Sequence, residues 1–225
     1  MLKITWFGHS MWLIENELVK IVLDPFTDIG YQLPKDLNPD IVIASHDHSD
    51  HNNFKMFMKF DNNNRQVQGA FQKISQVGTY KTKGTMIKLI EASHGIVNGK
   101  KLGDIYLILI VVDGITILHC SDLGVVPKDD FINDLGQIDI LMVPIGGYYT
   151  LDASQAKELI LQLNPKIVFP MHYHTNNCTI ENLEGIEPFL KLFPKVEKNS
   201  SNCWLVEGNN LPKTMKIVRL MIDKQ

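Results

Sequence analysis

The first 27 residues contain three short segments that can pair only as an antiparallel meander. Each segment is apolar, aromatic and β-branched, and breaks at Gly8-His9 and at Asn16 separate the segments. Connections of two or three residues are too short for the crossover that parallel neighbours need. This start therefore excludes a single sheet that is parallel throughout. The expected strands are Lys3–Phe7, Met11–Glu15 and Leu18–Leu23.

The rest of the chain alternates further strands with a few helices. Ile41–Ser45 is an unbroken apolar run, which predicts a strand buried on both faces. Helices are expected over Phe54–Arg65, over Asp152–Leu163 with Asp152 as N-cap, and over Ile180–Phe193. The other expected strands are Lys73–Val77, Thr85–Ala92, Ile105–Val112, Ile115–His119, Ile138–Val143, Lys166–Pro170, Cys203–Val206 and Met215–Ile222.

This order of elements favours an α/β chain of the α+β kind, with mixed sheets between helix layers, over a doubly wound fold. No linker, low-complexity tract or charge block divides the sequence, so we expect one domain over residues 1–225. A chain of this length buries a substantial core without the help of metals. A bound metal would therefore serve chemistry rather than folding.

The charge and the cysteine content limit which classes of partner and which cellular compartment are expected. The net charge of −3 and pI of 6.2 give no basic footprint, so a nucleic-acid partner is not expected. Three widely spaced cysteines, Cys120, Cys178 and Cys203, suit a reducing compartment. The start resembles no signal peptide, and the longest apolar run, Ile105–Val112, is too short for a membrane span. We expect a cytoplasmic protein with a small-molecule substrate; a homo-oligomer is left open.

Three of the eight histidines lie within a short segment directly after the strand that ends at Ser45, in the pattern His46-x-His48-x-Asp50-His51. In an extended chain alternate residues point to one side, which aims two imidazoles and a carboxylate at one volume. Such ligands suit zinc, manganese, iron or nickel, and the segment lacks the cysteines of a closed structural zinc site. The spacing favours a metal site over a polar surface loop rich in histidine.

This motif resembles the signature of the metallo-β-lactamase superfamily, and later landmarks follow in that family's order. They are Ser93-His94-Gly95, Ser121-Asp122 and Pro170-Met171-His172. Three further segments are similar to the branch that contains L-ascorbate-6-phosphate lactonase and uncharacterised metal-dependent hydrolases. These are Phe7-Gly8-His9-Ser10, Leu23-Asp24-Pro25-Phe26 and Pro144-Ile145-Gly146-Gly147. The resemblance extends over nearly the whole chain.

The resemblance implies an αββα four-layer sandwich with the site at one edge of the two sheets. It implies two divalent metal ions, with zinc the first expectation and manganese, iron or nickel as alternatives. His46, His48 and His94 would hold the first ion, Asp50, His51 and His172 the second, and Asp122 would bridge both. One position departs from the pattern, because Ser121 stands where the family usually has glycine before the bridging aspartate.

Other residues have roles that the sequence leaves open. Asp50 and His9 are the candidates for catalysis; the branch resemblance favours a substrate-facing rim for His9, and a buried polar role in the meander is the alternative. Asp24 is a candidate hydrogen-bond acceptor for a metal-ligating histidine. His119 reads as an interior histidine, and His174 as a proton shuttle, a phosphate-binding group or an exposed residue. Three aromatic residues could line a substrate pocket or lie in the core: Trp12, Tyr148 and Tyr149.

The chemistry implied is hydrolysis of an ester, lactone or phosphoester of a small metabolite by a metal-bridging hydroxide. Asp50 would move the proton at the leaving group. One alternative is a nuclease or phosphodiesterase of the same fold, which the acidic pI and the lack of a basic arm disfavour. Another is a mononuclear-iron oxygenase, which keeps the same histidine pattern. A diiron oxidoreductase would carry Glu at the position of His48.

Overall fold

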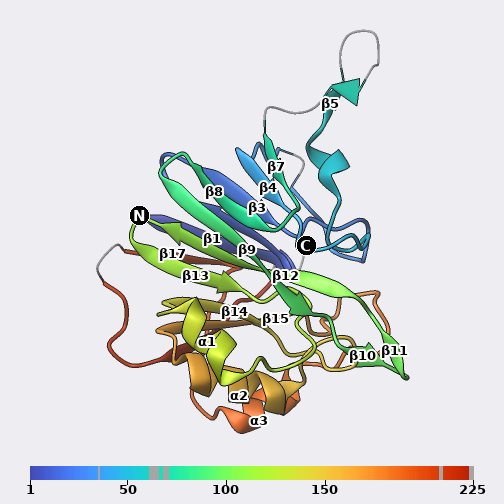
Figure 1. Ribbon diagram of the computed structural model, residues 1–225, viewed down its shortest axis with the longest axis vertical. Coiled ribbons are helices and arrows are strands. Elements are labelled where there is room, and N and C mark those ends of the chain that lie inside the picture. Colours follow the sequence, from blue (N-terminus) through green and yellow to red (C-terminus); the bar gives the residue numbers. More distant parts are fainter. Residues whose placement is uncertain (35, 61–65, 68–70, 208–209, 223–225) are drawn as a thin grey trace.

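Two mixed β-sheets form the centre of the computed structural model, which describes residues 1–34, 36–60, 66–67, 71–207 and 210–222 (Figure 1). The six-stranded sheet has the order β17-β1-β2-β3-β4-β7, and the eight-stranded sheet has the order β16-β18-β15-β14-β13-β12-β9-β8. In the six-stranded sheet β17, β1, β2 and β3 pair antiparallel, whereas β4 and β7 run parallel to β3. The N-terminal meander is therefore antiparallel, as predicted.

The strands of the six-stranded sheet are β1 (Leu2–Gly8), β2 (Met11–Glu15), β3 (Lys20–Leu23), β4 (Ile41–Ile43), β7 (Gln72–Ile74) and β17 (Cys203–Val206). Those of the eight-stranded sheet are β8 (Gly78–Thr82), β9 (Thr85–Ser93), β12 (Asp104–Val112), β13 (Ile115–His119), β14 (Ile140–Pro144), β15 (Ile167–Met171), β16 (Val196–Lys198) and β18 (Lys216–Arg219). Two short pairs lie outside these sheets, β5 (Lys59–Phe60) with β6 (Gln66–Val67) and β10 (Ile96–Val97) with β11 (Lys100–Lys101).

The main apolar core lies between the two sheets. Trp6 of β1 and Trp12 of β2 are fully buried there, and the ring of Trp12 packs on Phe169 of β15 with centroids 5.6 Å apart. Alternate residues of the same strands, such as Phe7 and Leu13, face the other way into a second apolar cluster. Both faces of the meander are thus covered, which explains why its sequence is apolar almost without interruption.

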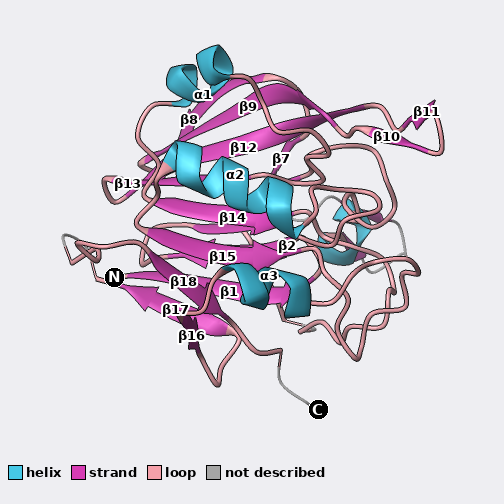
Figure 2. Ribbon diagram, turned by 90° about the horizontal axis from the view of Figure 1, so that it is seen from below, coloured by secondary structure: helices cyan, strands magenta, loops and turns pink. Residues whose placement is uncertain are grey.

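Three helices cover the outer face of the eight-stranded sheet: α1 (Asp129–Leu135), α2 (Ala153–Leu163) and α3 (Glu187–Leu192) (Figure 2). Asp152 is the N-cap of helix α2, as predicted, and it forms a capping box: Asp152 Oδ1 accepts from the backbone N–H of Ser154 and of Gln155, and Gln155 Oε1 accepts from the Asp152 N–H. Its buried stripe faces the sheet and comprises Ala153, Ala156, Leu159, Ile160 and Leu163.

Loops cover the outer face of the six-stranded sheet, together with the 3₁₀ turn η1 (Phe54–Phe57). A helix over Phe54–Arg65 is therefore wrong for its described part, because Met58 is already extended and β5 follows; residues 61–65 lie outside the described residues. Phe54 and Phe57 are both buried, and a 3₁₀ turn places residues three apart on the same side. Burial of these two rings accounts for the tighter turn.

The helix predicted over Ile180–Phe193 is shorter than expected and begins at Glu187. Pro188 lies in its first turn, where no backbone N–H is needed, and it cannot lie inside a longer helix. Helix α1 and the strands β8 and β16 were not predicted. The predicted fold class is confirmed: the chain is an α/β sandwich of two mixed sheets with helices on an outer face (Figure 2). None of the helices in the described part of the chain has the length and apolar character of a membrane-spanning segment.

Candidate metal centre

Six strands carry the polar residues of one cluster at their carboxyl ends. β1, β3 and β4 contribute from one sheet and β9, β13 and β15 from the other, each through a residue at most three positions after the strand. Loops at the ends of strands hold side chains on a rigid frame, which favours assembly of a site there. In chain order these residues are His9, Asp24, His46, His94, Asp122 and His172.

Four of these strand ends contain a non-glycine residue in the left-handed backbone region. The φ angle is positive at His9 (48°), Asp24 (44°) and His172 (49°), and at Ser121 (50°), which precedes Asp122. Non-glycine residues in the left-handed region cost of order 1 kcal/mol each and persist where the surrounding structure enforces them. The packed strands therefore hold these four residues in conformations that an isolated chain would avoid.

Two glycines let neighbouring loops approach the strand ends closely. A Cβ atom at Gly124 would lie 2.0 Å from the carbonyl oxygen of His94, and one at Gly146 would lie 2.2 Å from that of His172. Both distances are impossible for a larger residue unless the backbone moves. The sequence analysis singled out Gly146 in Pro144-Ile145-Gly146-Gly147, and this contact gives the physical reason for a glycine at that position.

Asp122 lies at the centre of the cluster. Its Oδ2 is 3.2 Å from Nε2 of both His51 and His172, 3.6 Å from Nε2 of His94 and 4.0 Å from Nε2 of His46. Ligand atoms around a tetrahedral zinc ion, each about 2.1 Å from it, lie roughly 3.4 Å from one another. The separations around Asp122 thus match those of atoms that share a metal ion.

Candidate ligand atoms in the described residues fall into three groups, in each of which all the atoms lie within 4.8 Å of one another. One group contains His46, His48 and His94, a second His46, His51 and Asp122, and a third His9, His51 and His172. Asp122 Oδ1 is buried and has no hydrogen-bond partner, which normally costs about 1–3 kcal/mol. A cation would satisfy this oxygen, so the donor set fits a divalent metal.

The electrostatics of the cluster favour neutral imidazoles beside ionised carboxylates. Burial, reinforced by His51, lowers the pKa of His46 to about 3, and burial also lowers the pKa of His94. Burial alone would raise the pKa of Asp122, but His172 and His51 hold it well below its ordinary value. His51 is the exception: burial opposes its protonation, yet Asp122 and Asp24 raise its pKa well above the usual value. A proton on His51 therefore offsets part of the negative charge of Asp122 and Asp24, as a bound metal ion would do.

Asp24 orients His51. Its fully buried carboxylate accepts from the backbone N–H of Ser45 through Oδ1 (2.7 Å) and from the Ser45 hydroxyl through Oδ2 (2.8 Å). Oδ2 also lies 3.0 Å from Nδ1 of His51. A carboxylate that accepts from Nδ1 leaves Nε2 of the same ring as the ligand atom, and Nε2 is the atom that faces Asp122.

A chain of two hydroxyls extends this network to His46. Ser121 Oγ donates to Ser45 Oγ (2.5 Å), and Ser45 Oγ lies 2.9 Å from Nδ1 of His46. Because the Ser45 hydroxyl proton goes to Asp24, Nδ1 of His46 is the donor, and its Nε2, which lies 3.0 Å from Nδ1 of His48, carries the lone pair that a metal would bind. The serine that replaces the family's glycine thus adds a hydrogen bond to the network. The sequence marked Ser121 as a departure but gave no sign of this contact.

The cluster is closed on one side and open on the other. His51 and His172 are almost fully buried, whereas His48 is exposed and the Asp50 side chain is 28% exposed. Asp50 Oδ2 lies 3.7 Å from Nε2 of His51. The side of His48 and Asp50 is therefore one from which a substrate could reach the cluster.

All seven predicted ligands meet in this cluster, which we call the ligand cluster. It consists of His46, His48, Asp50, His51, His94, Asp122 and His172. The structure places His9 against the same cluster but fully buried, not at an exposed rim.

The remaining residues singled out in the sequence lie outside the ligand cluster. His119 is buried and hydrogen-bonded, with Nε2 2.9 Å from the Ser10 carbonyl oxygen and Nδ1 accepting from the Ser121 N–H. His174 is exposed. Trp12 is fully buried in the core, and its indole N–H donates to the sulfur of Met171. Trp12 therefore cannot line a substrate pocket.

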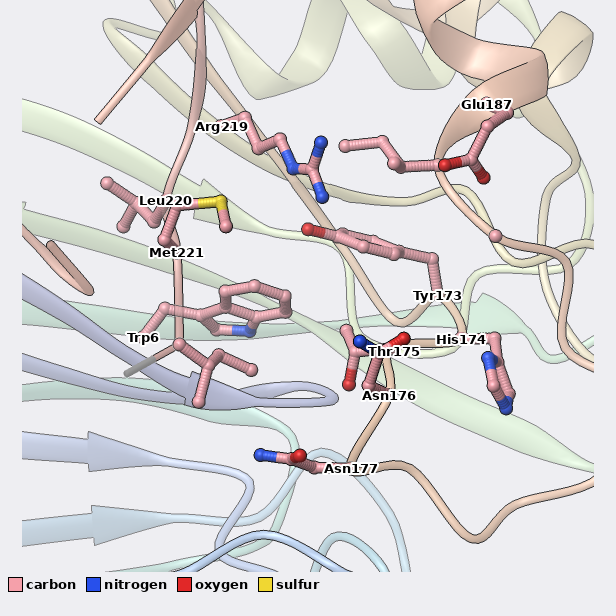
Figure 3. Close-up of a pocket in the computed structure, with 13 residues that line it drawn as sticks. Trp6, Tyr173, His174, Thr175, Asn176, Asn177, Glu187, Arg219, Leu220 and Met221 are labelled. Atoms are coloured by element: carbon pink, nitrogen blue, oxygen red, sulfur yellow. The ribbon is translucent and has the colours of Figure 1, made fainter. Parts of the chain in front are cut away.

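Two cavities lie near the strand ends. One, of about 240 Å³, adjoins His94, and its wall includes Ile96, Val97, Tyr148 and Tyr149. The other, of about 450 Å³, is lined by Trp6, Tyr173, His174, Glu187 and Arg219 among others (Figure 3). Although the second cavity is larger, its lining includes no residue of the ligand cluster. Position, rather than volume, therefore selects the smaller cavity as the one next to the candidate centre.

Known proteins share both the sequence and the fold of this chain. The family model for the β-lactamase superfamily domain matches residues 3–172. A UPF0173 metal-dependent hydrolase from Desulforamulus reducens is 32% identical over 194 residues, which cover 77% of this chain and 85% of the relative. The corresponding protein of Thermoplasma acidophilum is 31% identical over 221 residues, covering 88% of this chain and 97% of the relative.

A solved structure agrees over almost the full length. The crystal structure of a protein from Thermotoga maritima, assigned as a Zn-dependent hydrolase of the metallo-β-lactamase superfamily, superposes with a TM-score of 0.77 at 33% identity. The match covers 98% of each chain. The similarity thus includes all the strand ends that carry the ligand cluster.

Proposed function

This chain belongs to the β-lactamase superfamily, and from that membership we propose that it is a metal-dependent hydrolase whose reaction centre is the ligand cluster. The observation that carries the proposal is the position of Asp122 Oδ2, within 4.0 Å of the Nε2 atoms of four histidines from different parts of the chain. Apolar contacts would stabilise the fold better than buried imidazoles around one carboxylate do. The convergence therefore indicates a functional role.

In this proposal the ligand cluster holds two divalent ions, most readily zinc. His46, His48 and His94 would hold the first and Asp50, His51 and His172 the second, with Asp122 between them. When bound there, such ions supply Lewis acidity, which lowers the pKa of water and polarises the carbonyl or phosphoryl oxygen of a substrate. The chain's own contribution is to hold Nδ1 of His46 against Ser45 and Nδ1 of His51 against Asp24, so that Nε2 of each ring points towards the metal position.

Asp50 is the proposed proton carrier. Burial would raise the pKa of Asp50, but His9 and His51 hold it below its ordinary value, so the group enters the reaction as a carboxylate. It would accept the proton of the attacking water and then return that proton to the leaving-group oxygen. Partial exposure on the open side places it where a substrate would arrive.

The cavity beside His94 is the proposed substrate-binding region. Tyr148 and Ile96 are 46% and 65% exposed, so aromatic and aliphatic surface is available to a substrate there. A hydrogen bond from Asn98 Nδ2 to the Tyr148 hydroxyl (3.1 Å) links the turn between β10 and β11 to this wall. These features suit the uncharged part of an ester, lactone or phosphoester of a small metabolite.

Metal analysis of protein purified without added metal tests the proposal, followed by assays of lactone, phosphodiester and thioester substrates with zinc and with manganese. We expect close to two equivalents of metal and hydrolysis of at least one substrate class. The Asp50→Ala variant should stay folded and lose nearly all turnover, whereas Asp134→Ala, an exposed carboxylate on α1, should retain it. A single iron per chain without hydrolysis, or full activity of Asp50→Ala, would overturn the proposal.

A further inference from the structure

His9 has no place in the ligand set proposed above, yet it is the histidine with the fewest partners in the site. It is fully buried, and neither of its ring nitrogens has a hydrogen-bond partner in the part of the chain that the structure describes. Its ring packs on that of His172 with centroids 3.9 Å apart and lies 5.1 Å from that of His51. Among the described residues Nε2 has only the Asp50 carboxylate near it, at 3.3 Å, and Nδ1 has no partner. A buried polar atom without a partner costs about 1–3 kcal/mol, so a further ligand for this ring is to be expected.

The main chain fixes the position of this ring. The carbonyl oxygen of His9 accepts from the indole N–H of Trp6 (3.0 Å) and from the backbone N–H of His172 (3.1 Å). With φ at 48°, the residue turns out of β1 in a left-handed conformation. The hydrogen bond from His172 ties His9 to the end of β15, and the one from Trp6 holds it against its own strand, β1. The two imidazoles are therefore presented together, from different sheets.

The surroundings of the ring indicate a cation rather than a hydrogen-bonded carboxylate. Nε2 of His9 lies 3.3 Å from Oδ2 of Asp50, without the geometry of a hydrogen bond. A ligand atom of His9 lies within 4.8 Å of ligand atoms of both His51 and His172.

We propose that His9 is a further protein ligand of the second metal position, which His51 and His172 also bind. This inference rests on the proposed function. It makes the two positions unequal: the second is lined by three buried histidines, whereas the first includes the exposed His48. With His9 the second position would have three histidines and two carboxylates, Asp50 and Asp122, against three histidines and one carboxylate at the first. The second position should therefore hold its ion more tightly, and the first, which includes the exposed His48, should exchange its ion more readily.

The test compares His9→Asn with the wild type and with His174→Asn. Asparagine tolerates a left-handed backbone, but its side chain is too short to reach the place of Nε2. His174 is an exposed histidine two residues after His172 and serves as the control. Zinc content after dialysis and the visible spectrum of the cobalt-substituted protein are the readouts, and neither depends on turnover.

The wild type and His174→Asn should bind two equivalents, with one cobalt spectrum in common. His9→Asn should lose affinity at one position by at least about 10-fold, with a changed cobalt spectrum. His9→Gln, whose longer side chain reaches further, should recover part of that loss. Without metal, His9→Asn and the wild type should both unfold in a cooperative thermal transition, which shows that the loss of affinity comes from the missing ligand and not from an unfolded variant.

Wild-type metal affinity and cobalt spectrum in His9→Asn would overturn the inference and leave the proposed function intact. A lower melting temperature of the metal-free variant, with unchanged metal binding, would assign His9 a purely structural role and also overturn it. If the wild type itself bound no divalent ion, the proposed function would fail first.

Discussion

His172 and Tyr173 are consecutive residues at the end of β15, and they enter two very different environments. Both side chains are buried, at 1% and 3% exposure. His172 faces Asp122 among residues from six strand ends, whereas the ring of Tyr173 packs on Trp6 with centroids 5.3 Å apart. Burial raises the pKa of Tyr173 to about 12, and the nearby Arg219 opposes this rise. The comparison shows that a buried polar ring does not make a site; convergence of several strand ends does.

Changes on the His172 side should therefore remove metal and activity, and changes on the Tyr173 side should leave both intact. The strongest way to break this contrast is Asp122→Asn, which keeps the volume of the side chain and removes the charge that four histidines share. We expect the metal content to fall below detection and hydrolysis to fall to background. Metal analysis and the substrate panel measure the two effects. Asp134→Asn is the charge-matched control, and a variant Asp122→Asn with its full metal content would contradict the contrast.

Asp24→Asn should have the next largest effect, because it weakens the orientation of His51 without removing a ligand. Loss of such a carboxylate typically lowers metal affinity about 10–100-fold. Competition with a chromophoric chelator measures the affinity. Asp139→Asn is the matched control, since the Asp139 carboxylate accepts from the Thr116 N–H at the opposite end of the sheet. Equal losses in both variants would mean that Asp24 acts only through stability.

Ser121→Gly should have a smaller effect on stability, because it removes backbone strain but also removes a hydrogen bond. Glycine adopts the left-handed conformation without strain, but the hydrogen bond to Ser45 is lost. Each change amounts to about 1 kcal/mol, so the free energy of unfolding should change by less than about 1 kcal/mol. Metal affinity should fall only slightly. Chemical denaturation of the metal-free protein and chelator competition measure the two quantities. A loss of affinity as large as that of Asp24→Asn would show that the serine hydroxyls are needed to orient His46.

The smallest effect is expected on the Tyr173 side. Tyr173→Phe and Arg219→Met should leave the metal content unchanged and alter the free energy of unfolding by about 1 kcal/mol or less. Metal analysis and denaturation with urea provide the measurement. A variant of either residue that lost metal would show that the larger cavity and the ligand cluster are coupled, and the contrast between the two residues would have to be abandoned.

The sequence predicted which residues would meet, because ligand-type side chains in short motifs directly after apolar strands have few other uses. The positions of His94, Asp122 and His172 came from the family resemblance, since no local pattern links residues so far apart. The environment of His9 could not be predicted, because its burial depends on how closely β1 approaches the end of β15. The hydrogen bond between Ser121 and Ser45 likewise depends on the packing of two sheets.

Outside the site, too, features set by neighbouring residues could be predicted, whereas features set by tertiary packing could not. Asp152 could be predicted as a helix cap because aspartate is a favoured N-cap residue and apolar residues with helical spacing follow it directly. The turn at Phe54–Phe57 was taken for a longer helix, since its apolar spacing is compatible with both structures and tertiary burial decides between them. The late start of α3 could have been predicted from Pro188 alone.

The division of the ligand cluster between the two sheets has a consequence for how the molecule opens. His46 and His51 belong to one sheet, whereas His94, Asp122 and His172 belong to the other. An ion bound by both groups would bridge the sheets, so they could separate only after releasing it. By linkage, metal binding should then slow hydrogen exchange of the most protected amides in β3 and in β14 by the same factor, although neither strand is altered itself.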